Sequence, residues 1–311
     1  MSRALALHLA VIAALFAAQF VLPPYHHTNL ARIMVLATFA TGYNIAFGTT
    51  GLLSLGHALF FGAGIYACGL LVAQAGIAAA PALVAGLLAG GAMAAAVGVL
   101  ALRTGGVSFM IVTLMFAQAG YLSTLYFGTW TRGDEGFVLP RAARAIGAID
   151  LSADTPRYLA ALVLFSAGLL IHLALTRSAL GRAMVAMREN EERSRMLGYD
   201  PFRVKLAALA LSGAYAGAAG AAYAVLFGYV GATFASIQYS ILPLLYVLLG
   251  GAGTVLGPFL GALVMFYLID LSSSVTTAHL AVVGGALLLL VLFAPRGILG
   301  WVRERWAPWL P

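Results

Sequence analysis

The stretch RSALGRAMVAMRENEERSRMLGYDPFRVK, residues 177–205, holds seven of the 17 basic and four of the 10 acidic residues of this 311-residue chain. Apolar segments joined by short turns make up most of the remaining sequence. A segment this polar must lie in water, so it interrupts a lipid-compatible chain near its middle. Its helical spacing indicates a docking surface rather than a simple connector.

The composition excludes a soluble protein built around one core. Hydrophobic residues make up 62% of the chain and charged residues 9%, whereas a soluble domain carries about 25% charged residues. The mean hydropathy is +0.98. We therefore expect an all-α polytopic membrane protein. The net charge of +7 does not predict nucleic-acid binding, because the basic residues cluster at the ends of apolar spans.

Ten apolar stretches reach or approach the roughly 20 residues that a helix needs to cross a bilayer. The first has no small-residue cleavage site before Pro23, so it is predicted to be a span and not a signal peptide. The predicted spans are 4–22, 30–48, 54–75, 77–101, 107–127, 157–176, 204–226, 236–251, 256–272 and 278–294.

The arginines predict the topology. With both termini in the cytoplasm, ten crossings place the 177–205 segment on the cytoplasmic side between spans six and seven, together with Arg103, Arg296, Arg303 and Arg305. The nearly neutral loop 128–156 then lies outside, as expected if basic residues stay inside. We expect a single transmembrane domain over residues 1–311.

Glycine pairs four residues apart predict close helix packing, because this spacing puts small residues on one helix face. The pairs are Gly86 and Gly90, Gly213 and Gly217, and Gly257 and Gly261. The segments GTTGLLSLGHA (48–58) and GTVLGPFLGA (253–262) are faintly alike, but too weakly to indicate an internal repeat.

Within the charged segment, an apolar stripe at helical spacing predicts a surface helix. The stripe is Leu180, Ala183, Met184 and Met187. Predicted ion pairs, each contributing about 0.2–0.5 kcal/mol, are Arg188–Glu192, Glu189–Arg193 and Glu191–Arg195.

Gly198 is predicted to end this helix in a left-handed conformation, with Asp200 capping the next one and Pro201 at its first position. One interpretation of the segment is a helix that lies on the membrane surface and only orients its neighbours. The three nearby glutamates favour docking to a cytoplasmic protein.

Five stretches in order resemble the branched-chain amino-acid permease family of ABC importers, and the M-type of its paired membrane subunits more than the H-type. The charged segment is similar to the cytoplasmic coupling segment of that family. The others are YNIAFGTTGLLSLGHALFFGAGIYA (43–67), LRTGGVSFMIVTLMFAQ (102–118), GGAGTVLGPFLGA (250–262) and LFAPRGILG (292–300).

The resemblance implies a coupling segment at 177–203 that docks, from Gly181 to Gly198, onto a separate ATPase. The implied contacts are Leu180, Gly181, Arg182, Met184, Met187, Arg188, Glu189, Glu191, Glu192 and Gly198. The sequence independently predicts that ATP and Mg²⁺ bind elsewhere and that the chain is not an enzyme. A P-loop needs Gly-Lys followed by Ser or Thr, yet the single lysine, Lys205, follows Val204.

A translocation path needs polar groups inside the bundle. The candidates are Asn44, Thr49, Ser54, His57, Tyr66, Ser108, Thr113 and Gln118. Interhelical hydrogen bonding, worth roughly 0.6 kcal/mol, accounts for each residue as well. The glycine-broken segments 48–56 and 250–258 are either half-helices that approach the path or ordinary loop turns.

Other chemistry is disfavoured. Asp270 is the one acidic residue within a predicted span, close to its outer end, which argues against a proton or sodium carrier. The six histidines include the adjacent pair His26 and His27 but none four residues apart, and Cys68 is alone, so no metal site is expected. No Ser–His–Asp arrangement indicates nucleophilic catalysis.

The resemblance implies a permease subunit that forms half of an import path for branched-chain or other apolar amino acids. Its expected partners are an H-type permease, two cytoplasmic ATPases, a periplasmic or otherwise extracytoplasmic binding protein, and the lipid of a bacterial or archaeal cytoplasmic membrane. Urea, short amides and aromatic acids remain open as substrates. A channel or facilitator without ATPases is the alternative from another class.

Overall fold

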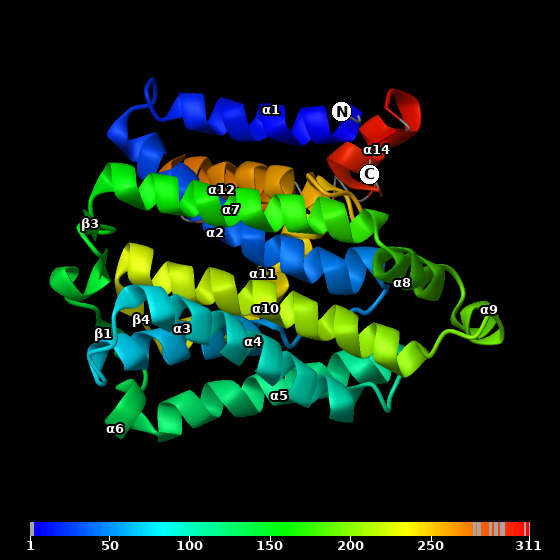
Figure 1. The fold of residues 1–311 in the computed structure, drawn as a ribbon, viewed down its shortest axis with the longest axis horizontal. Coiled ribbons are helices and arrows are strands. Elements are labelled where there is room, and N and C mark those ends of the chain that lie inside the picture. The colour runs from blue at the N-terminus through cyan, green and yellow to red at the C-terminus, as the bar shows by residue number, and fades with distance from the viewer. Residues whose placement is uncertain are drawn as a thin grey trace.

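The computed structural model describes residues 3–275, 278, 281–285, 288, 292, 296–307, 309 and 310. Long helices lie side by side, with strands and short helices at their ends (Figure 1). Six helices in this part of the chain are long and apolar enough to cross a membrane. They are α2 (Pro24–Asn44) with its π-helical end η1 (Ile45–Thr49), α4 (Ala79–Ala101), α5 (Gly106–Tyr126), α7 (Asp154–Arg177), α10 (Pro201–Phe227) and α12 (Gly257–Val275).

The remaining elements are shorter. The apolar ones are α1 (Arg3–Ala18), α3 (His57–Ala73) and α11 (Ile237–Gly250). The others are α6 (Gly128–Thr131), β1 (Phe137–Val138), η2 (Arg141–Arg144), β2 (Ala145–Ile146), β3 (Ile149–Asp150), α8 (Ala179–Glu189), α9 (Glu191–Met196), β4 (Tyr229–Val230), η3 (Ala232–Ala235) and α14 (Gly297–Arg305).

Helices occupy the first nine predicted spans. The largest boundary differences are at the start of α2, which begins at 24 and not 30, and at the end of α1, which stops at 18 and not 22. The predicted tenth span, 278–294, lies mostly outside the described residues. The structure therefore confirms a helical, polytopic protein of membrane-spanning composition.

Burial separates central helices from peripheral ones. In the most apolar stretch of each helix, 89% of the residues are buried for α2 and 78% for α10, but only 17% for α5. Figure 1 accordingly shows α5 at one edge of the bundle and α1 at the opposite edge, with α2 and α10 between them. The core that positions the functional residues is thus built on α2 and α10.

The predicted glycine pairs face one another across α4 and α10. A Cβ added at Gly90 would lie 2.5 Å from the carbonyl oxygen of Gly213 and from the Cα of Gly217. Gly257 and Gly261 pack in the same way against the end of α11. The prediction of close packing is confirmed, because a side chain at Gly90 would meet backbone that cannot move aside.

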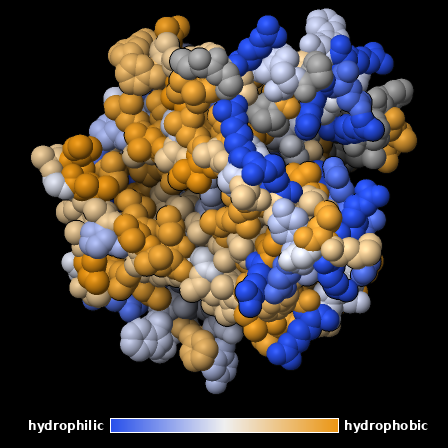
Figure 2. Space-filling view, turned by 45° about the vertical axis from the view of Figure 1, so that its right-hand side comes forward, coloured by the Kyte–Doolittle hydropathy of each residue, from blue (hydrophilic) through white to orange (hydrophobic). Residues whose placement is uncertain are grey.

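The two ends of the bundle differ. Figure 1 places α8, α9 and both termini at one end, and the small strands with α6 at the other. At the strand end, β1 pairs with β4, and the Arg144 guanidinium donates at 2.6 Å to the carbonyls of Val225 and Leu226 at the end of α10. Figure 2 brings the α8 end forward and shows hydrophilic residues gathered over it, beside apolar helix flanks.

Candidate functional site

The caps of the 177–205 segment explain where its helices begin. The Ser178 hydroxyl accepts from the N–H of Gly181 at 3.0 Å and starts α8. The Asp200 carboxylate accepts from the N–H groups of Phe202 and Arg203 at 3.0 and 3.3 Å and starts α10. Gly198 has a φ of +89°. The predicted turn at Gly198 and cap at Asp200 are confirmed.

The segment contains two helices where the sequence predicts one. Asn190 is extended, with φ −160° and ψ 105°, and its side chain accepts from the N–H of Arg193 at 2.9 Å. It therefore ends α8 and caps α9. The signal was present as an Asn followed by two glutamates, which suit the first turn of a helix.

Because Asn190 ends α8, only one of the three predicted ion pairs forms. The pairs Arg188–Glu192 and Glu189–Arg193 do not form, because their members lie on different helices. The third prediction is confirmed, since Glu191 lies 3.9 Å from Arg195 within α9. Glu191 also pairs with Lys205 of α10 at 2.5 Å, a contact that the helical spacing did not predict.

The apolar stripe of α8 faces the chain's own bundle. Met184 is 0% and Met187 4% exposed, and Leu180 is partly buried beside them. Their neighbours come from η1, the π-helical end of α2, and from α10, namely Ile45, Val204, Ala208 and Tyr215. The stripe therefore anchors α8 to the helices it crosses and leaves the opposite side of α8 open.

The outward side of the segment is polar along α8 and apolar at its tip. Arg182, Glu189 and Glu192 are exposed. Beyond them, Met196 is 82% and Leu197 70% exposed. Tyr199 and Phe202 are also exposed in the turn to α10. This apolar tip was not predicted from the sequence, although the apolar side chains of MLGYDPF, residues 196–202, were a signal for it.

Two helix breaks meet at the inner side of α8: residues 45–56, between α2 and α3, and residues 251–256, between α11 and α12. The Asn44 side chain donates to the carbonyl of Thr254 and accepts from the N–H of Gly253, both at 2.9 Å. A Cβ added at Gly48 would lie 2.5 Å from the nitrogen of Gly253. The end of α2 is thereby fastened to the turn between α11 and α12.

The contact between the breaks was not predicted. Asn44 and Gly253 lie 209 positions apart, beyond the reach of any periodicity argument. The faint likeness between 48–58 and 253–262 was the available signal.

Arg188 joins α8 to this junction. Its guanidinium donates to the carbonyl of Gly48. A Cβ added at Gly253 would lie 2.7 Å from the same Nη1 atom, and one added at Gly51 would lie 3.2 Å from Arg188 Cγ. One side chain of α8 thus touches both breaks.

Three of the candidate path residues gather around the start of α3. His57 Nε2 lies 2.7 Å from the Ser212 hydroxyl of α10, within hydrogen-bond distance. The Ser54 hydroxyl accepts from the N–H of Gly56 at 3.1 Å, and that of Thr113 from the N–H of Leu55 at 3.2 Å. These groups fix the loop between α2 and α3 and are buried.

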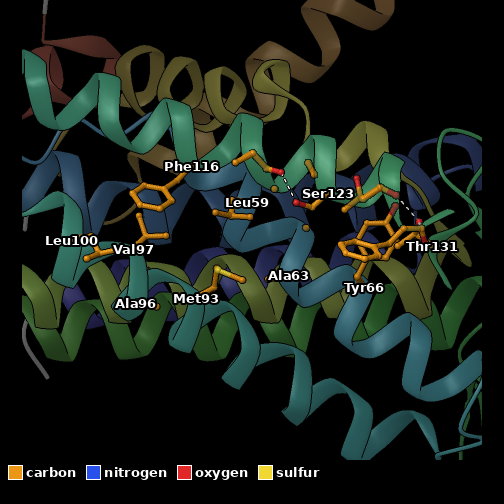
Figure 3. Close-up of a pocket in the computed structure, with 16 residues that line it drawn as sticks. Leu59, Ala63, Tyr66, Met93, Ala96, Val97, Leu100, Phe116, Ser123 and Thr131 are labelled. Atoms are coloured by element: carbon orange, nitrogen blue, oxygen red, sulfur yellow. Dashed lines mark hydrogen bonds between the residues drawn. The ribbon is translucent and has the colours of Figure 1, made fainter. Parts of the chain in front are cut away.

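The other candidates lie apart. Thr49 borders a cavity of about 580 Å³ beside Arg188. Tyr66 lines an apolar cavity of about 490 Å³ between α3, α4 and α5, which extends from Leu100 to Thr131 (Figure 3). Ser108 and Gln118 are exposed on α5. The structure therefore does not bring all eight residues to one place.

Across the described residues, no three His, Cys, Asp or Glu side chains lie close enough to hold a metal ion. The fold and this site define a polytopic helical membrane protein with a water-exposed helical segment fastened to helix breaks inside the bundle.

The comparisons give the family. The model of the family described as "Branched-chain amino acid transport system / permease component" matches residues 27–292, and the chain belongs to that family. The permease protein LivM of Escherichia coli K12 is 31% identical over 299 residues, covering 88% of this chain and 69% of the relative.

Two further relatives agree. LivM of Salmonella typhimurium is 29% identical, with 88% of this chain and 69% of the relative covered. LivH of Salmonella typhimurium is 26% identical over 280 residues, with 85% and 91% covered. All three are described as permease proteins of a high-affinity branched-chain amino acid transport system. No solved structure matches the chain.

Proposed function

We propose that the chain is an M-type permease subunit of an ATP-driven importer for branched-chain or other apolar amino acids in a bacterial or archaeal cytoplasmic membrane. It forms half of the path, with an H-type permease as the other half. ATP and Mg²⁺ bind to two cytoplasmic ATPases, and a binding protein delivers the substrate from outside. The substrate class is that named for the LivM and LivH relatives.

The observation that carries this proposal is the two-sided build of the 177–205 segment. Its inner side is fixed to α2 and α10 by Met184 and Met187. Its outer side presents Arg182 and Glu189, and the apolar tip formed by Met196, Leu197, Tyr199 and Phe202. A docked ATPase would meet this outer side, and its motion would reach the membrane helices through the inner side.

The orientation follows from this role. ATPases are cytoplasmic, so the end with α8 and both termini lies in the cytoplasm and the loop 128–156 lies outside. The loop 128–156 is held to α10 by Arg144, which makes it a firm surface for the binding protein.

The path runs between the two permeases. Asn44, Ser54 and Thr113 already bond within the chain, so their role is to hold the broken segments that border the path. The exposed polar residues of α5, Ser108 and Gln118, face the second permease. The path needs no charged side chain, because a path that binds its substrate weakly also releases it readily.

The experiment is uptake by the reconstituted complex with its ATPases and binding protein. We expect ATP-dependent uptake of leucine, isoleucine or valine. A panel of urea, short amides and aromatic acids tests the substrate class. Uptake that continues without ATPases, at an unchanged rate, would support a facilitator and overturn the importer.

A further inference from the structure

The contact of Arg188 with both helix breaks has a consequence for how motion passes through the protein. We propose that Arg188 is the positioning residue through which α8 holds the breaks at 45–56 and 251–256 together and moves them as one unit. This rests on the proposed function, because it names the link between the docked ATPase and the membrane helices.

The carbonyl of Gly48 is a suitable acceptor for a cation. It lies at the end of α2, where helix carbonyls lack partners within the helix and carry partial negative charge. The neighbouring carbonyls of Ala46 and Phe47 accept from the N–H groups of Leu52 and Gly51 at 2.8 and 3.0 Å. The Gly48 carbonyl instead accepts from Arg188, so the first break depends on α8.

The second break is within reach of the same guanidinium. The Nη1 atom that donates to Gly48 also occupies the space beside Gly253, where a Cβ would lie 2.7 Å from it. Asn44 bonds to Gly253 and Thr254 from the α2 side. Asn44 therefore bonds to this turn from the α2 side, and the Arg188 guanidinium lies beside the same turn from the docking segment.

The surroundings leave room for motion. Arg188 borders three cavities of about 450, 390 and 580 Å³ at this end of the bundle. The backbone of α8, in contrast, is tied to the bundle through Met184 and Met187. A shift of α8, together with the residues packed on Met184 and Met187, thus carries the guanidinium, and the cavities around it leave room for both glycine-containing breaks to follow.

The test compares Arg188→Met with Arg182→Met. Both replace an arginine of α8 by an unbranched apolar side chain, but the Arg182 guanidinium donates to the carbonyl of Arg177 and not to a break. Hydrogen–deuterium exchange is measured on the full-length chain in lipid nanodiscs. We expect Arg188→Met to speed exchange about tenfold in both 45–56 and 251–256, as loss of a charge-assisted hydrogen bond does for local opening. Arg182→Met leaves both segments unchanged.

A second readout uses the complete transporter. We expect Arg188→Met to lower substrate transported per ATP hydrolysed about tenfold, within the range typical of coupling between sites. Arg188→Lys restores part of this ratio, because an ammonium can still donate to one carbonyl. This variant also serves if Arg188→Met does not fold.

The outcomes separate the two proposals. Unchanged exchange in both breaks, or a change confined to 45–56, overturns the role of Arg188 even if ATPases dock. Absence of ATPase binding to the wild-type chain overturns the proposed function, while the exchange experiment still decides whether one side chain holds both breaks. A wild-type transport ratio in Arg188→Met also contradicts the inference.

Discussion

Helices α8 and α9 are neighbours in one charged segment, yet the apolar residues of α8 are buried against the bundle and those at the end of α9 are exposed. α8 buries Met184 and Met187 against α2 and α10, whereas α9 and its turn expose Met196 and Leu197. Both stretches are apolar, so the difference comes from what lies beside each helix. α8 therefore moves with the bundle, while the tip after α9 remains available to a partner.

The largest effect is expected at Met184. Met184→Asp puts an unpaired charge at a fully buried position and should lower the free energy of unfolding by about 3–5 kcal/mol. Val185→Asp, at the next and exposed position of α8, is the matched control and should change it by less than about 0.5 kcal/mol. Thermal denaturation of the purified full chain measures both. Equal effects would show that α8 is not anchored by this side chain.

The exposed tip should affect assembly and not folding. Met196→Asp combined with Leu197→Asp should weaken ATPase binding by about 30-fold, as expected when apolar anchors worth about 2 kcal/mol are lost. Val138→Asp changes an exposed apolar residue at the opposite end of the bundle and should leave binding unchanged. The measurement is ATPase affinity for the reconstituted permease pair. Wild-type affinity in the double variant would place the docking surface elsewhere.

Removal of the two caps compares the helices directly. Ser178→Ala removes the cap of α8 and should cost about 1 kcal/mol of global stability, because α8 is packed on the bundle. Asn190→Ala removes the cap of α9 and should speed hydrogen exchange in 191–196 with a smaller change in unfolding temperature. A larger global loss from Asn190→Ala would reverse the comparison.

The ion pair between α9 and α10 should have the smallest effect on stability. Glu191→Gln removes the charge that faces Lys205 at 2.5 Å, and since both side chains are partly in water the loss should be about 0.5 kcal/mol. High salt should reduce the difference from wild type, which denaturation at two salt concentrations measures. A salt-independent loss above about 2 kcal/mol would mean that this pair, and not the methionines, secures the segment.

Local patterns predicted the elements well. Hydrophobic length located the helices at the first nine predicted spans, the glycine spacing identified the seam between α4 and α10, and Gly198 and Asp200 marked the turn after α9. Each of these signals is local in the chain. A span is recognised from one continuous apolar stretch, and the glycine signals come from the absence of a side chain, which permits close packing or a left-handed turn.

The sequence did not predict the long-range contacts, or whether the apolar face of α8 packs on this chain or on a partner. The spacing of Met184 and Met187 predicted a stripe, but a stripe does not say whether a partner or the same chain covers it. Asn44 and Arg188 reach backbone groups more than 100 positions away. Since backbone atoms are chemically alike along the chain, no residue type marks them as the acceptors of these bonds.

The most direct measurement of the central claim is the side of the membrane from which the tip can be reached. Leu197→Cys gives a single exposed thiol, because the native Cys68 is buried. A membrane-impermeant maleimide should label it in inside-out vesicles, fail to label it in right-side-out vesicles, and label it more slowly once ATPases are bound. Labelling from the outer face, or labelling that ATPases do not slow, would contradict the account.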